Sequence, residues 1–213
     1  MQMRFSTYRL LACMAVVVLA GLPGVAAADE WDSCVKLSDD LAVAGCSRAI
    51  DSHQYTGQSL ARLYARRGGA YAAKGDVNRA VADYNESMRI DPTYPAAYLN
   101  RGNVWFHRGD FDRAIADYNQ AIQLDPKYGS AYVNRGSAWG NKGDLDRAIA
   151  DYNQAIRLDP KDTKAYYNRG MAWEKKRSLQ AALADFKMHA QLAPSDRDGR
   201  TALKRVSKEL GAR

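Results

Sequence analysis

The chain has 213 residues and a formal net charge of +7 at neutral pH, and 46% of its residues are hydrophobic. Its 31 basic and 24 acidic residues are interleaved, without the clustered basic stripe or recognisable module of nucleic-acid-binding proteins, so we expect no nucleic-acid partner. Frequent Ala, Tyr, Asp and Arg, with few runs of β-branched residues, favour helices.

Residues 1–28 have the pattern of a cleavable secretory signal. Two arginines precede an uncharged stretch over residues 10–28, and Ala26 and Ala28 are the small residues of a cleavage site. We therefore expect a periplasmic or secreted protein that begins at Asp29, with the formal charge reduced from +7 to +5 by loss of the two arginines. An uncleaved membrane anchor is the alternative, although its glycines and proline would weaken a spanning helix. No later segment is apolar enough to span a membrane.

Residues 29–58 are interpreted as a degenerate helix pair followed by a connector. The segment DLAVAGCSRAI at Asp40–Ile50 imitates DRAIADYNQAI at Asp112–Ile122. Cys46 stands where the later segment has Tyr118, and Cys34 falls where a partner helix would face it. In an exported chain, these two cysteines are expected to form a disulfide. Metal binding is the alternative, disfavoured because two cysteines without a nearby histidine make a poor site.

A unit of 34 residues then recurs four times, over residues 61–94, 95–128, 129–162 and 163–196. The second and third units are identical at 23 of 34 positions without a gap. The repeated columns are Tyr64, Tyr98, Tyr132 and Tyr166; Gly68, Gly102, Gly136 and Gly170; Tyr71, Trp105, Trp139 and Trp173; Ala80, Ala114, Ala148 and Ala182; Tyr84, Tyr118, Tyr152 and Phe186; and Pro92, Pro126, Pro160 and Pro194.

These columns resemble the tetratricopeptide repeat family, whose units read W-x₂-L-G-x₂-Y, then A-x₃-F, then Pro at the same period. The resemblance covers 136 of 213 residues. It implies an all-α fold in which helix-turn-helix units stack into a right-handed superhelical α-solenoid. The residues support this independently, because Ala114, Ile115 and Tyr118 recur at helical spacing and form an apolar face. Such a face is buried only when neighbouring units stack on it.

Residues 197–213 are predicted to form a capping helix at the end of the array. Leu203, Val206 and Leu210 lie on one helical face, which would cover the last apolar surface. The basic residues on the opposite side are interpreted as a solvated face.

One column departs from the family in every unit, because Arg replaces the usual Leu. An Asp follows each of these arginines by sixteen residues, and an unpaired buried Arg would be costly. We therefore predict ion pairs, within each unit or between neighbouring units, since the planar guanidinium suits a carboxylate. The pairs are Arg67 with Asp83, Arg101 with Asp117, Arg135 with Asp151, and Arg169 with Asp185.

Motifs for catalysis, phosphate binding or metal binding are missing from the sequence. The three histidines, His53, His107 and His189, are isolated from one another. We therefore expect neither an enzyme nor a metal or cofactor site.

In the resembled family, the first helices of the units line a concave groove that binds extended peptides or partner helices. The resemblance therefore implies a peptide or protein partner. Carried over column by column, the candidate groove residues are Arg66, Leu99, Asn100, Asn103, Phe106, Asn134, Lys164, Tyr167, Asn168 and Met171.

Three of these candidates, Asn100, Asn134 and Asn168, stand 34 residues apart and are predicted to form a ladder. An amide carries both a donor and an acceptor and can hold a peptide backbone, while local capping by these asparagines is the alternative. Some family members grip a C-terminal carboxylate, but Leu99 and Asn168 replace two of the basic residues of that clamp.

These observations predict an exported scaffold or adaptor that binds a partner in the groove. Two alternatives remain open. The array could assemble with itself into homo-oligomers, or it could be a regulatory subunit of an envelope enzyme that uses its convex face.

Overall fold

The computed structural model describes residue 34 and residues 39–211, so the expected signal at residues 1–28 lies outside the described part. Within that part the regular secondary structure is entirely helical, which confirms the all-α prediction. The helices are α2 (Asp39–Asp51), α3 (Gly57–Ala73), α4 (Val77–Ile90), α5 (Pro95–His107), α6 (Phe111–Leu124), α7 (Gly129–Lys142), α8 (Leu145–Leu158), α9 (Thr163–Lys175), α10 (Leu179–Leu192) and α11 (Arg197–Gly211).

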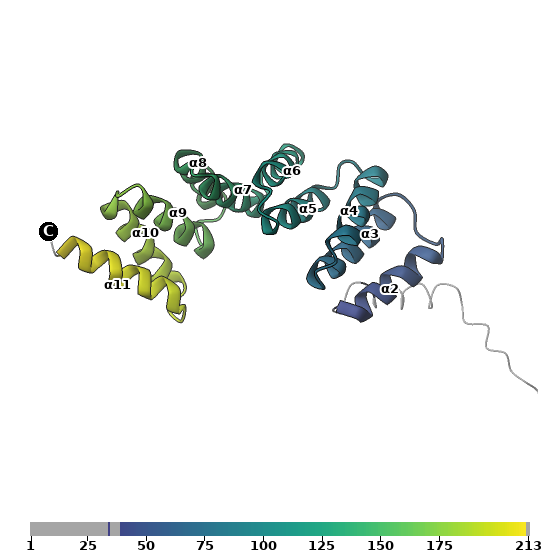
Figure 1. Cartoon of the computed structure of the whole chain (residues 1–213), viewed down its shortest axis with the longest axis horizontal. Helices are drawn as coiled ribbons and strands as arrows, with labels where there is room; N and C mark the ends of the chain where they lie inside the picture. Colours follow the sequence, from purple (N-terminus) through teal and green to yellow (C-terminus); the bar gives the residue numbers. More distant parts are fainter. Residues whose placement is uncertain (1–33, 35–38, 212–213) are drawn as a thin grey trace, which may run out of the picture.

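The helices form a solenoid of stacked pairs. The pairs α3–α4, α5–α6, α7–α8 and α9–α10 correspond to the four sequence units, and the second helix of each pair packs on the first helix of the next. Helix α2 packs on α3 and helix α11 packs on α10. Figure 1 shows the resulting arch, with α2 and α11 at its opposite ends.

In each of the first three units, the sharp turn between the two helices follows from a Gly-Asp pair. In the third unit, Gly143 has φ of +89°, a left-handed conformation that glycine adopts without a side-chain clash. Asp144 then caps α8, because its side chain accepts a hydrogen bond from the backbone N–H of Arg147 at 3.0 Å. The fourth unit lacks this pair, so Arg177 itself adopts a φ of +63° and Ser178 makes no side-chain cap.

The two helices of a unit approach closely at the glycine that recurs every 34 residues. A Cβ atom on Gly102 would lie 2.7 Å from Cε1 of Tyr118, closer than packed carbon atoms tolerate. The glycine column and the large ring opposite it are therefore complementary parts of one packing contact. The rings themselves are fully buried, with Tyr118 1% exposed and Phe186 0% exposed.

The core is continuous along the array because large side chains bridge neighbouring clusters. Trp139 packs against the buried residues of both the second and the third unit, and Trp173 does the same for the third and fourth. No unit buries its apolar face alone, which is the behaviour expected of a solenoid. At the end of the chain, Ala202 and Val206 of α11 cover Phe186.

Candidate functional site

The structure contains an ion pair in each of the four predicted Arg–Asp columns. Each guanidinium donates from Nε and Nη2 to the two oxygens of one carboxylate, at distances of 2.6–2.9 Å. Each pair joins the two helices of a single unit. The carboxylates are buried: Asp83, Asp117, Asp151 and Asp185 are 5–6% exposed.

The remaining guanidinium nitrogen, Nη1, reaches the preceding unit. Nη1 of Arg101 donates to Asn85, that of Arg135 to Asn119, and that of Arg169 to Asn153. At the front, Nη1 of Arg67 donates to Ser47 at 3.1 Å. Ser47 therefore takes the place of these asparagines. It aligns with Asn119 when Asp40–Ile50 is set against Asp112–Ile122.

The arginine column thus serves a structural purpose. The hydrogen bonds to Asp117 and Asp151 raise the pKa of Arg101 and Arg135 above the usual guanidinium value, so both side chains stay charged. Because each guanidinium is fully engaged within and between units, it fixes how one unit is oriented on the next.

Two hollows lie along the face formed by the first helices α5, α7 and α9, and we call this face the groove. The first hollow measures about 270 Å³ and the second about 150 Å³, so each has room for a side chain rather than a whole small-molecule ligand. The first is lined by Asn103, Phe106, His107, Tyr118, Asn134 and Ser137. The second is lined by Ser137, Gly140, Asn141, Leu145, Tyr152, Asn168, Met171, Ala172 and Lys175.

The two hollows are equivalent in the 34-residue register. Positions 103, 106, 107, 118 and 134 of the first correspond to positions 137, 140, 141, 152 and 168 of the second. The main difference in shape is that Phe106 is replaced by Gly140. Phe106 gives the first hollow an aromatic wall, whereas Met171 and the aliphatic stem of Lys175 border the second.

The asparagines of the predicted ladder are partly used within the array. Nδ2 of Asn134 donates to Oδ1 of Asn103 at 2.8 Å, and Nδ2 of Asn168 lies 3.4 Å from Oγ of Ser137. Asn100 makes no such bond, because the corresponding position of the preceding unit is Gly69. Among the described residues, nothing donates to Oδ1 of Asn134 or Asn168, so these acceptors remain open to a partner.

Two tyrosine hydroxyls that the sequence assigned to the core also reach the hollows. The hydroxyl of Tyr118 donates to Asn103 at 2.9 Å, and that of Tyr152 donates to Ser137 at 3.2 Å. Burial raises the pKa of Tyr152 to about 12, so its hydroxyl remains protonated. These hydrogen bonds orient the polar floor of each hollow from the second helix of the unit.

The prediction that Leu99 lines the groove is wrong, and the half-buried Tyr167 lies outside both hollows. Leu99 is 6% exposed and packs in the core, as do its equivalents Ala65 and Val133. The ring of Tyr167 lies 5.9 Å from that of Phe186, between centroids, and packs against the last core cluster. This column faces the second helix of its unit, and its apolar character in all four units is the signal that would have placed it in the core.

Three further candidates lie outside the hollows: Asn100 and the cationic Arg66 and Lys164. Nε of Arg66 donates to the backbone carbonyl of Cys34 at 3.2 Å, so this side chain contacts the front of the chain. Lys164 is exposed at the start of α9, beyond the lining of either hollow. Of the ten predicted groove residues, Asn103, Phe106, Asn134, Asn168 and Met171 line the hollows.

Cys34 and Cys46 lie together at the front of the array. Their Sγ atoms are 2.07 Å apart, and both side chains are fully buried beside Leu63 of α3. The two residues therefore have the placement of a bonded pair.

Residue 34 and residues 39–211 include neither a candidate metal site nor a candidate membrane span. No group of three histidine, cysteine or acidic side chains in this part of the chain could hold a metal ion. None of its helices has the length and apolar character needed to cross a bilayer. His189 is 5% exposed, with Nδ1 2.9 Å from the carbonyl of Thr163 and Nε2 2.7 Å from Asp196, so it holds α11 in place.

Comparison with protein-family models gives matches within the repeat region. A model described as "Tetratricopeptide repeat" matches residues 95–128, and one described as "TPR repeat" matches residues 68–107 and 141–176. A comparison with curated protein sequences finds no match.

Several solved structures share the fold. MamA is 24% identical, with a TM-score of 0.64 over 73% of this chain and 88% of that chain. YrrB, described as a TPR protein with an unusual peptide-binding site, is 20% identical, with a TM-score of 0.64 over 79% of this chain and 84% of that chain. The first TPR of Spaghetti (RPAP3), bound to the HSP90 peptide SRMEEVD, is 29% identical, with a TM-score of 0.54 over 55% of this chain and 93% of that chain.

Proposed function

Because the chain belongs to the tetratricopeptide repeat family, we propose that it is an exported scaffold or adaptor that binds a peptide or protein partner in its groove. Two structurally similar proteins have peptide binding in their descriptions, Spaghetti (RPAP3) and YrrB. Their likeness supports a peptide as the class of ligand and leaves its sequence open.

The observation that carries the proposal is the alternation of open amide acceptors and side-chain-sized hollows along the groove. Oδ1 of Asn134 and Asn168 can accept from the backbone N–H groups of an extended segment, whatever its side chains. Equivalent hollows in stacked helices are about 10 Å apart, close to three residues of extended chain. A bound peptide would therefore place every third side chain in a hollow.

The charges around the groove favour an acidic partner. Lys175 borders the second hollow, and no described residue forms an ion pair with it. The nearby acid, Glu174, is neutralised by Arg205, whose Nη2 lies 2.6 Å from Oε2. Lys164 adds a second exposed cation on the same helix. Acidic residues of a partner would be attracted by these lysines and would not be repelled by Glu174, which is already paired.

The test is to select binding peptides from a random displayed library and to measure their dissociation constants by fluorescence anisotropy. Phe106→Ala and the double variant Asn134→Ala/Asn168→Ala should each weaken binding about tenfold, since they remove an apolar wall or two hydrogen-bond acceptors. The matched control is Gln123→Ala, an exposed polar residue on α6 outside both hollows.

Binding that survives both groove variants would show that partners use another face, as in a regulatory subunit held by its convex side. Circular dichroism of each variant checks that the helices are retained.

Export is part of the same proposal and rests on the signal pattern of residues 1–28 and on the paired cysteines. In an oxidising compartment Cys34 and Cys46 would form a disulfide that fastens α2 to the front of the array. The mass of the protein recovered from each cell fraction tests both points. A cytoplasmic protein that retains residues 1–28, with Cys34 and Cys46 both open to alkylation, would contradict export.

A further inference from the structure

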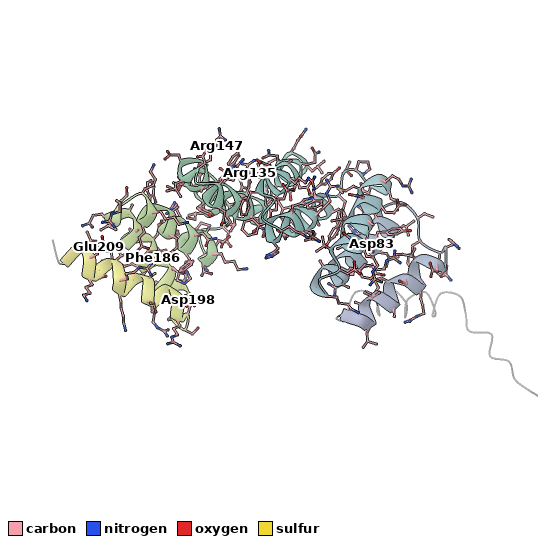
Figure 2. The ribbon with its side chains drawn as sticks, in the orientation of Figure 1. Asp83, Arg135, Arg147, Phe186, Asp198 and Glu209 are labelled. Carbon is pink, nitrogen blue, oxygen red and sulfur yellow. A yellow bond between two sulfur atoms is a disulfide. The ribbon has the colours of Figure 1, made fainter. Side chains whose placement is uncertain are left out.

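The last helix presents a row of cations on its outermost face. Arg197, Arg200, Lys204 and Lys208 follow one another at spacings of three or four residues, so they share one side of α11. All four are exposed, while Gly199, Ala202 and Val206 on the opposite side are buried. We call these four residues the basic stripe. In Figure 2, nitrogen-tipped side chains project from the free side of α11.

The acids around α11 do not neutralise this stripe. Glu174 pairs with Arg205, Glu209 with Arg177, and Asp196 with His189. Figure 2 places the two acids of α11, Asp198 and Glu209, near the two ends of the helix.

The stripe itself makes no ion pair among the described residues, and Arg200 only donates to the backbone carbonyl of Pro194. Like charges at these spacings destabilise a helix. The stability of the capping helix therefore does not explain why the four cations lie in one row. Many cations inside the repeats, by contrast, form ion pairs with nearby acids. Arg147, for example, pairs with Asp144 and Lys142 with Asp112. A single-sign row on the outermost helix therefore points to a negatively charged partner.

The opposite end of the same chain has the complementary charge. Residues 29–60 contain six acidic and two basic residues, a formal charge of −4, whereas residues 197–213 contain six basic and two acidic residues, a formal charge of +4. Five of the acids fall within residues 29–40, which we call the acidic segment. They are Asp29, Glu30, Asp32, Asp39 and Asp40.

We propose that the basic stripe of one copy binds the acidic segment of a second copy, so that copies associate head to tail. Figure 1 shows α2 and α11 at opposite ends of the arch, which favours a contact between copies over one within a copy. The apolar face of α11 is buried against α10, so the helix has no apolar side left to insert into a membrane. A head-to-tail contact uses different surfaces on the two copies and can therefore repeat.

The contact is independent of the groove and leaves it free for a partner. Because the cations of the stripe are exposed, each ion pair strengthens association only about 1.4- to 5-fold, and salt screens it. Association is therefore expected at high protein concentration and low ionic strength.

Charge reversal at each end tests the proposal by sedimentation velocity of the purified protein between about 10 µM and 1 mM. The front variant is Glu30→Lys/Asp32→Lys, and the back variant is Lys204→Glu/Lys208→Glu. The matched control is Lys127→Glu/Lys161→Glu, two exposed lysines in the turns between units that form no ion pair with any described residue. Melting curves establish that each variant is folded, and Lys204→Ala/Lys208→Ala replaces the back variant if it is not.

The wild-type mass should rise with concentration at about 50 mM salt and return to that of a monomer at about 500 mM. The front and back variants should each associate about 2- to 30-fold more weakly, and the control should behave as the wild type. Mixing the front and back variants should restore association, because each then offers the charge that the other lacks.

A wild-type monomer at every concentration, association that either variant leaves unchanged, or failure of the mixture to recover would overturn the proposal. Binding of the monomer to phosphatidylglycerol vesicles that is lost in the back variant would assign the stripe to a lipid surface instead, and would equally overturn it.

Discussion

Arg135 donates two parallel hydrogen bonds to Asp151, from Nε to Oδ2 at 2.9 Å and from Nη2 to Oδ1 at 2.6 Å. Its Nη1 donates to Oδ1 of Asn119 at 2.7 Å. One guanidinium therefore joins helices α7, α8 and α6, the last of which belongs to the preceding unit. Since the same arrangement recurs in every unit, these arginines set the angle between units along the whole array.

Breaking this pair from one side should cost more than removing it altogether. Arg135→Leu or Asp151→Leu alone strands a partly or fully buried charge and should lower the free energy of unfolding by about 2–4 kcal/mol. The double variant replaces the pair with apolar side chains and should lose about 1 kcal/mol or less. Urea unfolding followed by circular dichroism measures all three.

The exposed pair Arg147–Asp144 is the control for this cycle, because its arginine side chain is 63% exposed. The variant Arg147→Leu should change the free energy of unfolding by less than about 1 kcal/mol. Strictly additive losses for Arg135 and Asp151 would mean that the two residues act separately.

Two glycines of α7 should respond to alanine with opposite signs. A Cβ on Gly136 would lie 2.8 Å from Cε1 of Tyr152 and 3.1 Å from the carbonyl oxygen of Ala148, so Gly136→Ala should cost about 1–3 kcal/mol. A Cβ on Gly140 would meet only Cβ of Ala148, at 3.8 Å. Gly140→Ala should therefore stabilise by up to about 1 kcal/mol through helix propensity. Thermal melting distinguishes the two, and equal effects would contradict the packing described.

The 34-residue period was sufficient to predict the stacked helix pairs and to align residues that meet. Periodic columns report directly on contacts in a solenoid, because equivalent residues occupy equivalent places. The pairing of Arg135 with Asp151 could be anticipated because two charged columns at a constant separation have a simple electrostatic reason. The contact from Arg135 to Asn119 was not anticipated, since an asparagine column has many explanations.

The groove was harder to predict than the fold. Adjacent residues of a helix point in directions about 100° apart, so a shift of one position moves a side chain from the groove to the core. For this reason the sequence assigned Leu99 to the wrong side of its helix. The column alone could not show that Asn134 would donate to Asn103, because the bond depends on how closely one unit approaches the next. Asn100 lacks this bond only because Gly69 provides no acceptor side chain, so identical residues in one column differ in what they leave open.

The cysteine pair should stabilise the front of the array. Cys34 and Cys46 are twelve residues apart in sequence, and closing such a loop is worth about 3 kcal/mol in the loop-entropy estimate. Cys34→Ala/Cys46→Ala should therefore increase hydrogen exchange in α2 while leaving α7 and α8 unchanged. Wild-type protein treated with a reductant is the matched control and should exchange like the variant. Alkylation of Cys34 and Cys46 in the untreated protein would show that the bond is not formed.

The attachment of α11 should depend on pH through Asp196. Its carboxylate accepts hydrogen bonds from His189 at 2.7 Å and from the backbone N–H of Gly199 at 3.1 Å, which hold the pKa of Asp196 below its usual value of 3.8. A lowered pKa in the folded state means that the stabilisation is complete above pH 3.8 and is lost as the pH falls through the lowered value. Asp196→Asn should therefore lower the melting temperature at neutral pH, and its difference from the wild type should disappear in strong acid. Asp198→Asn is the control, because Asp198 forms no ion pair with any residue that the structure describes and should show little difference at either pH. A deficit of Asp196→Asn that stayed constant with pH would mean that the charge of this carboxylate does not hold the capping helix.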